Sequence, residues 1–270
     1  MSRVCTYCDS LAVRNVIEGW LPSLRNQYIG DVAVFCYGLS DEDQQRLRIA
    51  GADLLIDVKP AWPEDGFEHP DWAYSFVRSW ADYCAELPAG EGVLIYDGAD
   101  VGFQGPIGHL VTQMDGASHI FMAHEPRALE DSPSTMHAIE TVLGPDEFAR
   151  VGKTLKKKQL LNSGIVAGSA GVVGACFSAC LEHMRACGQG IWCAEQAWLN
   201  YWAYILHPGS VKVAANKWCY DLRFYPWTVD AKERYLDKAG NVIPVVHAAG
   251  LVDQKLYGVM RPMKKQYGNV

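Results

Sequence analysis

The sequence predicts an α/β fold, with a mixed, mainly parallel central sheet flanked by helices in a single domain over residues 1–270. Short apolar runs alternate with helical patterns through the first hundred residues, which is typical of stacked β-α-β units. The chain is long enough to bury about three-quarters of its unfolded surface. Its composition, 49% hydrophobic and 20% charged, is that of an ordinary globular protein. Such a domain needs neither a disulfide nor a structural metal to fold.

In the first hundred residues the expected elements alternate regularly. Apolar residues recur at helical spacing over 13–24, and Val32–Tyr37 is a continuous apolar run that predicts a buried strand. Ser40 begins a capping-box-like pattern and Gly51 supplies the stop of a helix expected over 41–50. The other elements predicted here are strands at 4–7, 54–56 and 93–96 and a helix at 71–87.

After residue 100 the regularity weakens. Apolar runs predict strands that we expect to complete the same sheet, and longer patterns predict two more helices. Four lysines, Lys153 and Lys156–Lys158, precede one of these strands and predict a solvated basic loop. The expected strands are 120–123, 160–166, 211–214 and 242–246, and the expected helices are 170–187 and 193–203.

Charge and hydropathy exclude two classes of partner. With 24 basic and 31 acidic side chains, the formal net charge is −7, which argues against a broad footprint on nucleic acid. Residues 159–181 carry no charge, but their asparagine, serines and glycines predict a buried strand and a core helix instead of a membrane span.

The nine cysteines predict a reduced protein. Their number is odd, the chain is long, and the first residues run straight into a strand-like segment, so a disulfide framework is disfavoured and a cytoplasmic location is expected. An alternative stays open at this point. Cys5-x-x-Cys8 is half of a zinc or redox pair, on which an interaction module could be built.

The most informative segment follows the strand expected at 93–96. Asp97 and Asp100 leave the carboxyl end of that strand, which is the edge of an open α/β sheet where ligands bind. Paired carboxylates suit a divalent cation that also takes substrate phosphates. The competing interpretation is a solvated turn, because Asp-Gly is common in turns.

Together with four further motifs, these residues resemble GT-A glycosyltransferases. Asp97-Gly98-Ala99-Asp100 is similar to the D-x-x-D metal-binding motif in the glycosyltransferase domain of lysyl hydroxylases, beside the commoner D-x-D of glycogenin-like enzymes. The other motifs are Thr6 and Asp9 after the first strand, Asn162-Ser163-Gly164 for the family's N-[AS]-G, Glu195-Gln196 for its D-Q pair, and His247-Ala248-Ala249-Gly250 for its terminal H-x-x-G. They follow the family's order over about residues 4–257.

The resemblance implies a GT-A (Rossmann-like) fold, with a nucleotide-binding half in residues 1–100 and an acceptor- and sugar-binding half in 101–270. It also implies that Asp97, Asp100 and His247 hold Mn²⁺ or Mg²⁺ against the donor diphosphate. The other implied roles are nucleobase and ribose contact for Thr6 and Asp9, donor contact for Arg78, donor-sugar contact for Asn162 and Ser163, diphosphate contact for Lys255, and a catalytic, sugar-facing role for Glu195 and Gln196.

The predicted function is transfer of a sugar from a nucleotide-diphosphate donor, expected to be a UDP-sugar, to a hydroxyl acceptor whose class the sequence leaves open. Two alternatives share the fold. One is a non-catalytic carbohydrate- or nucleotide-binding protein. The other is a nucleotidyltransferase, which would carry a Gly-rich basic loop after the first strand, where this chain has Cys8-Asp9-Ser10-Leu11. A G-x-G-x-x-G motif does not follow that strand either, so a dinucleotide oxidoreductase is poorly supported.

Overall fold

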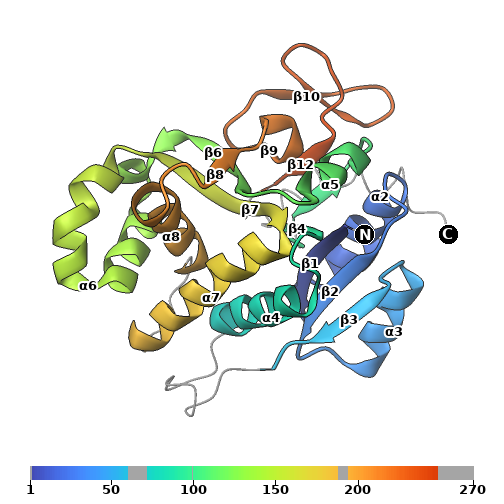
Figure 1. The fold of residues 1–270 in the computed structure, drawn as a ribbon. Coiled ribbons are helices and arrows are strands. Elements are labelled where there is room, and N and C mark those ends of the chain that lie inside the picture. Colours follow the sequence, from blue (N-terminus) through green and yellow to red (C-terminus); the bar gives the residue numbers. More distant parts are fainter. Residues whose placement is uncertain (1, 60–71, 99, 188–193, 249–270) are drawn as a thin grey trace.

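The computed structural model describes residues 2–59, 72–98, 100–187 and 194–248. A seven-stranded sheet forms its centre (Figure 1). In spatial order its strands are β3 (Leu54–Asp57), β2 (Val32–Tyr37), β1 (Arg3–Asp9), β4 (Gly92–Tyr96), β7 (Gln159–Ser169), β6 (Ile120–Ala128) and β8 (Val211–Val213). Only β7 among these strands runs antiparallel to its neighbours, β4 and β6. The mixed, mainly parallel sheet is therefore as predicted.

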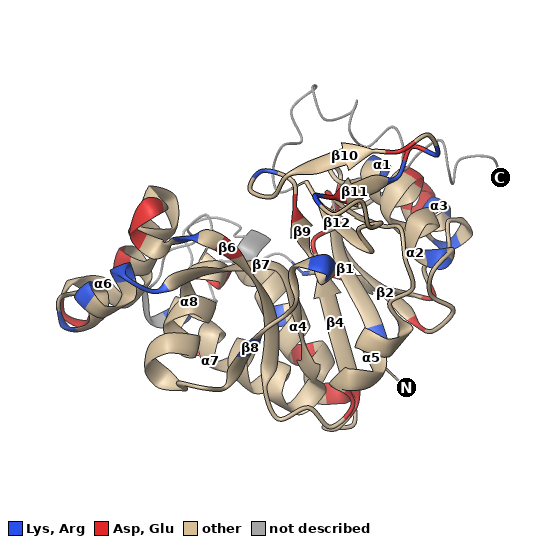
Figure 2. Cartoon of the chain, turned by 90° about the horizontal axis from the view of Figure 1, so that it is seen from above, with Lys and Arg blue, Asp and Glu red and all other residues tan. Residues whose placement is uncertain are grey.

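Helices cover both faces of this sheet, because each strand alternates its side chains between two hydrophobic cores. The first core lies under α4 (Trp72–Glu86), α6 (Pro133–Lys156), α7 (Ala170–Cys187) and α8 (Ala194–Tyr201). The second lies under α1 (Val13–Asn15), a π-helical turn (Val16–Trp20), α2 (Leu21–Arg25), α3 (Asp41–Ile49) and α5 (Gly108–Met114). Figure 2 shows many of the charged residues on the outer helices and loops, while the central strands β4 and β7 are uncharged.

The alternation of side chains along β1 rules out a zinc site made by Cys5 and Cys8. Cys5 lies in the first core and Cys8 in the second, because positions three apart in a strand face opposite sides of the sheet. The two thiols of this pair therefore cannot hold one ion. Seven of the described cysteines are free and buried, at positions 5, 8, 36, 84, 176, 180 and 219. Burial raises the thiol pKa of Cys36 and Cys84 to about 12.

The second half departs from the prediction of one sheet. Three short strands, β5 (Val101–Phe103), β12 (Val245–His247) and β9 (Tyr220–Asp221), form a separate sheet beside the main one. A hairpin of β10 (Trp227–Val229) and β11 (Tyr235–Asp237) lies above it (Figure 1). The last strand starts later than predicted, after Pro244, which has no N–H to give to a ladder.

The predicted basic loop is correct only for Lys157 and Lys158, which lie in a turn after the helix. Helix α6 continues to Lys156, so Lys153 and Lys156 lie in its last turn. Gly144, at φ 72°, breaks the helical backbone just before Pro145, which hides the helix from a periodicity analysis. The uncharged stretch forms β7 followed directly by α7, as expected apart from an intervening turn. Among the described residues, no helix is both long and apolar enough to span a membrane.

Candidate active site

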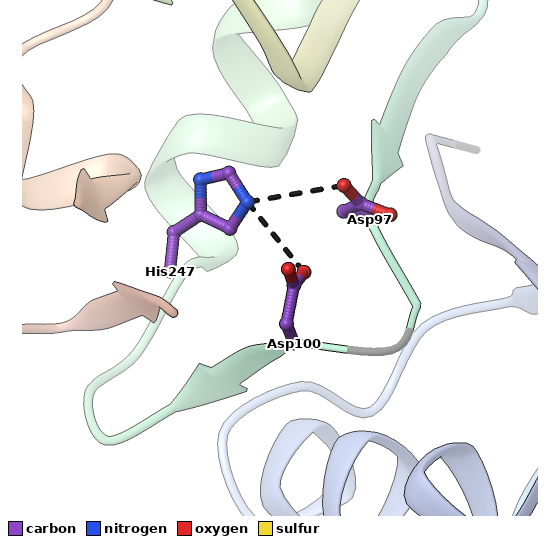
Figure 3. A group of neighbouring side chains, drawn as sticks. All are labelled: Asp97, Asp100 and His247. Atoms are coloured by element: carbon purple, nitrogen blue, oxygen red, sulfur yellow. Dashed lines mark ion pairs between the residues drawn. The ribbon is translucent and has the colours of Figure 1, made fainter. Parts of the chain in front are cut away.

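Asp97, Asp100 and His247 come together at the carboxyl end of β4 (Figure 3). The two aspartates lie in the short segment between β4 and β5, and His247 is the last residue of β12. Register brings them into contact, because His247 pairs with Val101 across the antiparallel β12–β5 ladder. The backbone N–H of Ala248 donates to the Asp100 carbonyl at 2.8 Å, which closes the ladder beside the second carboxylate.

The three side chains are arranged as a cation site. His247 Nε2 lies 3.5 Å from Asp100 Oδ1 and 3.8 Å from Asp97 Oδ2, and one ligand atom from each residue falls within 4.8 Å of the others. His247 is 3% exposed, and its Nε2 has no hydrogen-bond partner among the described residues. A buried imidazole nitrogen aimed between two carboxylates fits a divalent cation with mixed nitrogen and oxygen ligands.

The electrostatics of the three side chains also favour a bound cation. Burial and the charge of Asp100 raise the pKa of Asp97. Burial disfavours the imidazolium of His247, but Cys219, Asp100 and Asp97 outweigh it and raise the His247 pKa well above its usual value. The cluster thus stabilises a positive charge at the point where Nε2 and the carboxylates meet, which is the property that a cation site requires.

Two glycines make room for the cluster. A Cβ atom on Gly164 would lie 2.4 Å from His247 Cε1, so the imidazole occupies the space that a side chain would fill. The same glycine accepts a hydrogen bond at its carbonyl from the Asp97 N–H. A Cβ atom on Gly98 would lie 2.3 Å from the Tyr7 carbonyl oxygen. The glycines of the N-S-G and D-G-A-D sequences are therefore required by close packing.

The expected sugar-facing residues form a hydrogen-bonded group next to the cluster. Asn162 accepts from the Gly164 N–H and donates to Glu125 Oε1 at 2.9 Å. Ser163 donates from its N–H and its hydroxyl to Gln196 Oε1. Glu195 lies at the start of α8, and its charge adds to burial and to the charges of Asp97 and Asp100 in raising the pKa of Tyr7.

Gln196 is largely occupied by other parts of the chain. Its amide nitrogen donates to Thr135 Oγ1 at 3.3 Å, while its oxygen accepts from Ser163, so it ties α8 to both α6 and β7. Gln196 and Asn162 are 9% and 7% exposed. Any contact that they make with a ligand has to use the small exposed part of each amide.

The remaining predicted residues are placed separately. Thr6 is fully buried, and its hydroxyl donates to the Tyr96 carbonyl, so it ties β1 to β4 instead of reaching the sheet edge. Asp9 accepts from the N–H groups of Leu11 and Ala12 at the partly exposed exit of β1. Arg78 donates to the Lys59 carbonyl. It lines a groove between α4 and β3 that is not lined by any of the three cluster residues. Lys255 lies outside the described residues.

Sequence reasoning missed several groups that contact the site. Tyr7 donates a hydrogen bond to Asp97 Oδ1, and Cys219 Sγ lies 3.4 Å from His247 Nδ1. Glu125 is 2% exposed and contacts Arg127, Arg223 and Asn162. Tyr7 lies between Thr6 and Asp9 at the end of β1, where the sequence predicts donor contacts, so its position indicated that it could be near the site. Cys219 and Glu125 carry no motif that the sequence alone reveals.

Comparison with solved structures finds this fold in glycosyltransferases. The galactosyltransferase LgtC, solved in complex with donor and acceptor sugar analogues, superimposes with a TM-score of 0.62 and 16% identity, over 99% of this chain and 97% of that one. An active-site mutant of LgtC gives a TM-score of 0.61 at the same identity and coverage. Mouse xyloside xylosyltransferase 1 in its apo form gives 0.57 and 12% identity, over 93% of this chain and 98% of that one.

Neither a family profile nor a curated protein matches the sequence. The expected likeness to lysyl hydroxylases therefore stays a prediction. The strand order, the two helical layers and the full-length superpositions agree with one another. The chain has the fold of the GT-A glycosyltransferases.

Proposed function

We propose that this protein is a metal-dependent glycosyltransferase, which moves a sugar from a nucleotide-diphosphate donor to a hydroxyl acceptor. The observation that carries the proposal is the convergence of Asp97, Asp100 and His247 at the carboxyl end of β4, in a fold shared with a galactosyltransferase and a xylosyltransferase. Ligands of open α/β sheets bind at this edge. The proposal includes a cytoplasmic location, which the free, buried cysteines favour.

In the proposed site, Asp97, Asp100 and His247 hold Mn²⁺ or Mg²⁺. The bound ion supplies neutralisation of the charge that develops on the diphosphate as the glycosidic bond breaks. Asp9 at the exit of β1 contacts the ribose or base of a UDP donor, and Lys255 is the cation proposed for its diphosphate. The expected donor contact of Arg78 is disfavoured, because Arg78 is held by the Lys59 carbonyl in a groove whose lining includes none of the cluster residues. Thr6 supports this region from within the sheet, through its bond to Tyr96.

We place the donor sugar against Glu195, Gln196, Asn162 and Ser163. Glu195 is supported by its charge, which adds to burial and the charges of Asp97 and Asp100 in raising the pKa of Tyr7, the residue that donates to Asp97. For Gln196 a purely structural role competes, since its amide already contacts Ser163 and Thr135. Glu195→Ala and Gln196→Ala separate the two roles. A sugar contact predicts a loss of turnover of roughly 10- to 100-fold with UDP affinity unchanged, whereas a structural role predicts equal losses together with a lower melting temperature.

The first test is a thermal-shift panel of nucleotide sugars with and without Mn²⁺, followed by donor-hydrolysis and transfer assays. A ligand at 100 times its Kd adds about 2.7 kcal/mol of stability, so the correct donor should stand out, and only with the metal. Stabilisation without turnover would instead indicate the non-catalytic binding protein. Release of pyrophosphate from a nucleoside triphosphate and a sugar phosphate would indicate the nucleotidyltransferase. Full transfer activity in EDTA would refute metal dependence.

A further inference from the structure

Two of the three cluster side chains are contacted from behind by other groups. Tyr7 Oη donates to Asp97 Oδ1, and Cys219 Sγ lies 3.4 Å from His247 Nδ1. The atoms of these two residues that face each other are the opposite ones, Asp97 Oδ2 and His247 Nε2, which lie 3.8 Å apart. Each side chain therefore turns one polar atom toward the candidate cation position and the other toward a holding group.

We propose that Tyr7 and Cys219 are positioning residues, which hold Asp97 and His247 in the orientation that binds a divalent cation. This inference rests on the proposed function, because it takes the cluster to be a cation site. Groups that hydrogen-bond to metal ligands fix their orientation, and removing one such group typically weakens metal binding 10- to 100-fold.

The position of Tyr7 makes it suited to this role. Its ring is held against two aromatic side chains of α4, with ring centroids 4.9 Å from Phe76 and 6.0 Å from Trp80. From this fixed position the Tyr7 hydroxyl donates to Asp97 Oδ1. With Oδ1 of Asp97 engaged by this donor, Oδ2 is the oxygen left facing the cluster, which favours a monodentate ligand.

Cys219 holds the histidine in a complementary way. If Nε2 binds a cation, the imidazole keeps its proton on Nδ1, and the acceptor for that proton is Cys219 Sγ. Cys219 is 4% exposed and follows a 3-10 turn, Asn216–Trp218. The Sγ atom therefore reaches His247 Nδ1 from a buried position on the side of the ring opposite Nε2.

The test is a titration of the full chain with Mn²⁺ in the presence of UDP, in which free Mn²⁺ is followed by its EPR signal. Tyr7→Phe and Cys219→Ala should each raise the Kd for Mn²⁺ about 10-fold or more. Cys219→Ser keeps a hydrogen-bonding atom and should retain most of the affinity. The matched control is Tyr37→Phe, because the Tyr37 ring packs against the same Phe76, at 5.9 Å, from the neighbouring strand β2.

The outcomes separate this inference from the proposed function. If the wild-type chain does not take up Mn²⁺ with UDP, the proposed function fails. If the wild type binds and both deletions bind as tightly, only the positioning role fails. Equal losses in Tyr37→Phe and Tyr7→Phe would also overturn it, since generic packing would then be responsible. Metal-free melting temperatures check folding, and the Cys219→Ser and Cys219→Ala pair keeps the test valid if Tyr7→Phe does not fold.

Discussion

Two groups of acidic side chains, buried except for the half-buried Asp97, lie next to each other in this protein, and they are neutralised differently. In the first group, Glu125 and Asp221 are paired with arginines: Arg127 Nε lies 2.6 Å from Glu125, and Arg223 Nη2 lies 2.8 Å from Asp221 and 3.3 Å from Glu125. In the second group, Asp97 and Asp100 face the His247 imidazole, whose Nε2 lies 3.8 Å from Asp97 Oδ2 and 3.5 Å from Asp100 Oδ1.

The difference separates a structural acid group from a functional one. Arginine is always charged, so the first group is neutralised permanently and fastens the segment after β9 to β6. The positive charge of His247 comes from a proton, which a metal ion can replace. The two groups touch through Asn162, which donates to Glu125 and accepts from the Gly164 N–H behind His247. A rigid acid group thus supports one that is ready to accept a cation.

The largest effect should come from removing a ligand of the second group. We expect Asp100→Asn and His247→Ala to lower sugar transfer or donor hydrolysis by about 1,000-fold, because the metal contributes several kcal/mol to the transition state. The melting temperature without metal should be retained in Asp100→Asn, since it removes one of two repelling carboxylates. Steady-state rates and circular dichroism check the two expectations. Wild-type turnover in either variant would place the chemistry elsewhere.

Breaking the first group should cost stability instead. Glu125→Gln leaves Arg127 and Arg223 beside a neutral amide, and removing one partner of a buried ion pair costs about 3 kcal/mol. For a chain of this size that is roughly 6–12 °C in melting temperature. Glu18→Gln is the control, because its pair with Arg14 lies on the surface and should shift stability by less than about 1 kcal/mol. Equal melting temperatures for the two variants would contradict the structural role.

A smaller effect is expected when the space beside the His247 ring is filled. In Gly164→Ala the new Cβ would meet the His247 ring at 2.4 Å, so the imidazole has to move and Mn²⁺ binding should weaken about 10-fold, or about 1.4 kcal/mol. Gly19→Ala is the matched control, because a Cβ there meets nothing within 4 Å. Calorimetric titration of both variants with Mn²⁺ and UDP measures the effect. Unchanged affinity in Gly164→Ala would mean that the ring position is not critical.

The smallest effect belongs to Glu147, which is also paired with an arginine, Arg150, but is only partly buried. Hydrogen bonds from Arg150 and Tyr201 lower the pKa of Glu147 to about 2. A depressed carboxyl pKa adds stability at pH values above the unfolded pKa, near 4.3, and this stability is lost as the pH falls toward 2. Glu147→Gln should therefore cost less than about 1 kcal/mol at pH 7 and nothing near pH 2. Urea denaturation at both pH values checks this, and a pH-independent difference would contradict it.

The sequence predicts the regular part of the fold well. The strand at 32–37, the Ser40 cap and the helix from Asp41 are found as expected, because each is encoded by local periodicity or by a capping side chain. Three-residue strands such as β5 and β12 are too short to show a period, and their pairing is set by residues more than 140 positions apart.

The site residues could likewise be predicted only in part. The motif resemblance brought Asp97, Asp100 and His247 together, and the structure places them side by side. The contacts behind them could not be predicted. Tyr7 lies between two predicted residues, Thr6 and Asp9, but its bond to Asp97, like the contact of Cys219 with His247, depends on the packing of β1 and of the turn before β9. A sequence motif contains the residues that would bind a ligand, whereas the residues that hold them in position are determined by tertiary contacts.

The β12–β5 register has a consequence for biosynthesis. Asp97 and Asp100 leave the ribosome long before His247, which must pair with Val101 before the imidazole lies beside the carboxylates. A nascent chain that ends before residue 247 can form much of the central sheet. In such a chain the Asp97 and Asp100 carboxylates lie close together without the His247 imidazole. We therefore expect metal loading to be a late event, which follows synthesis of the C-terminal strand.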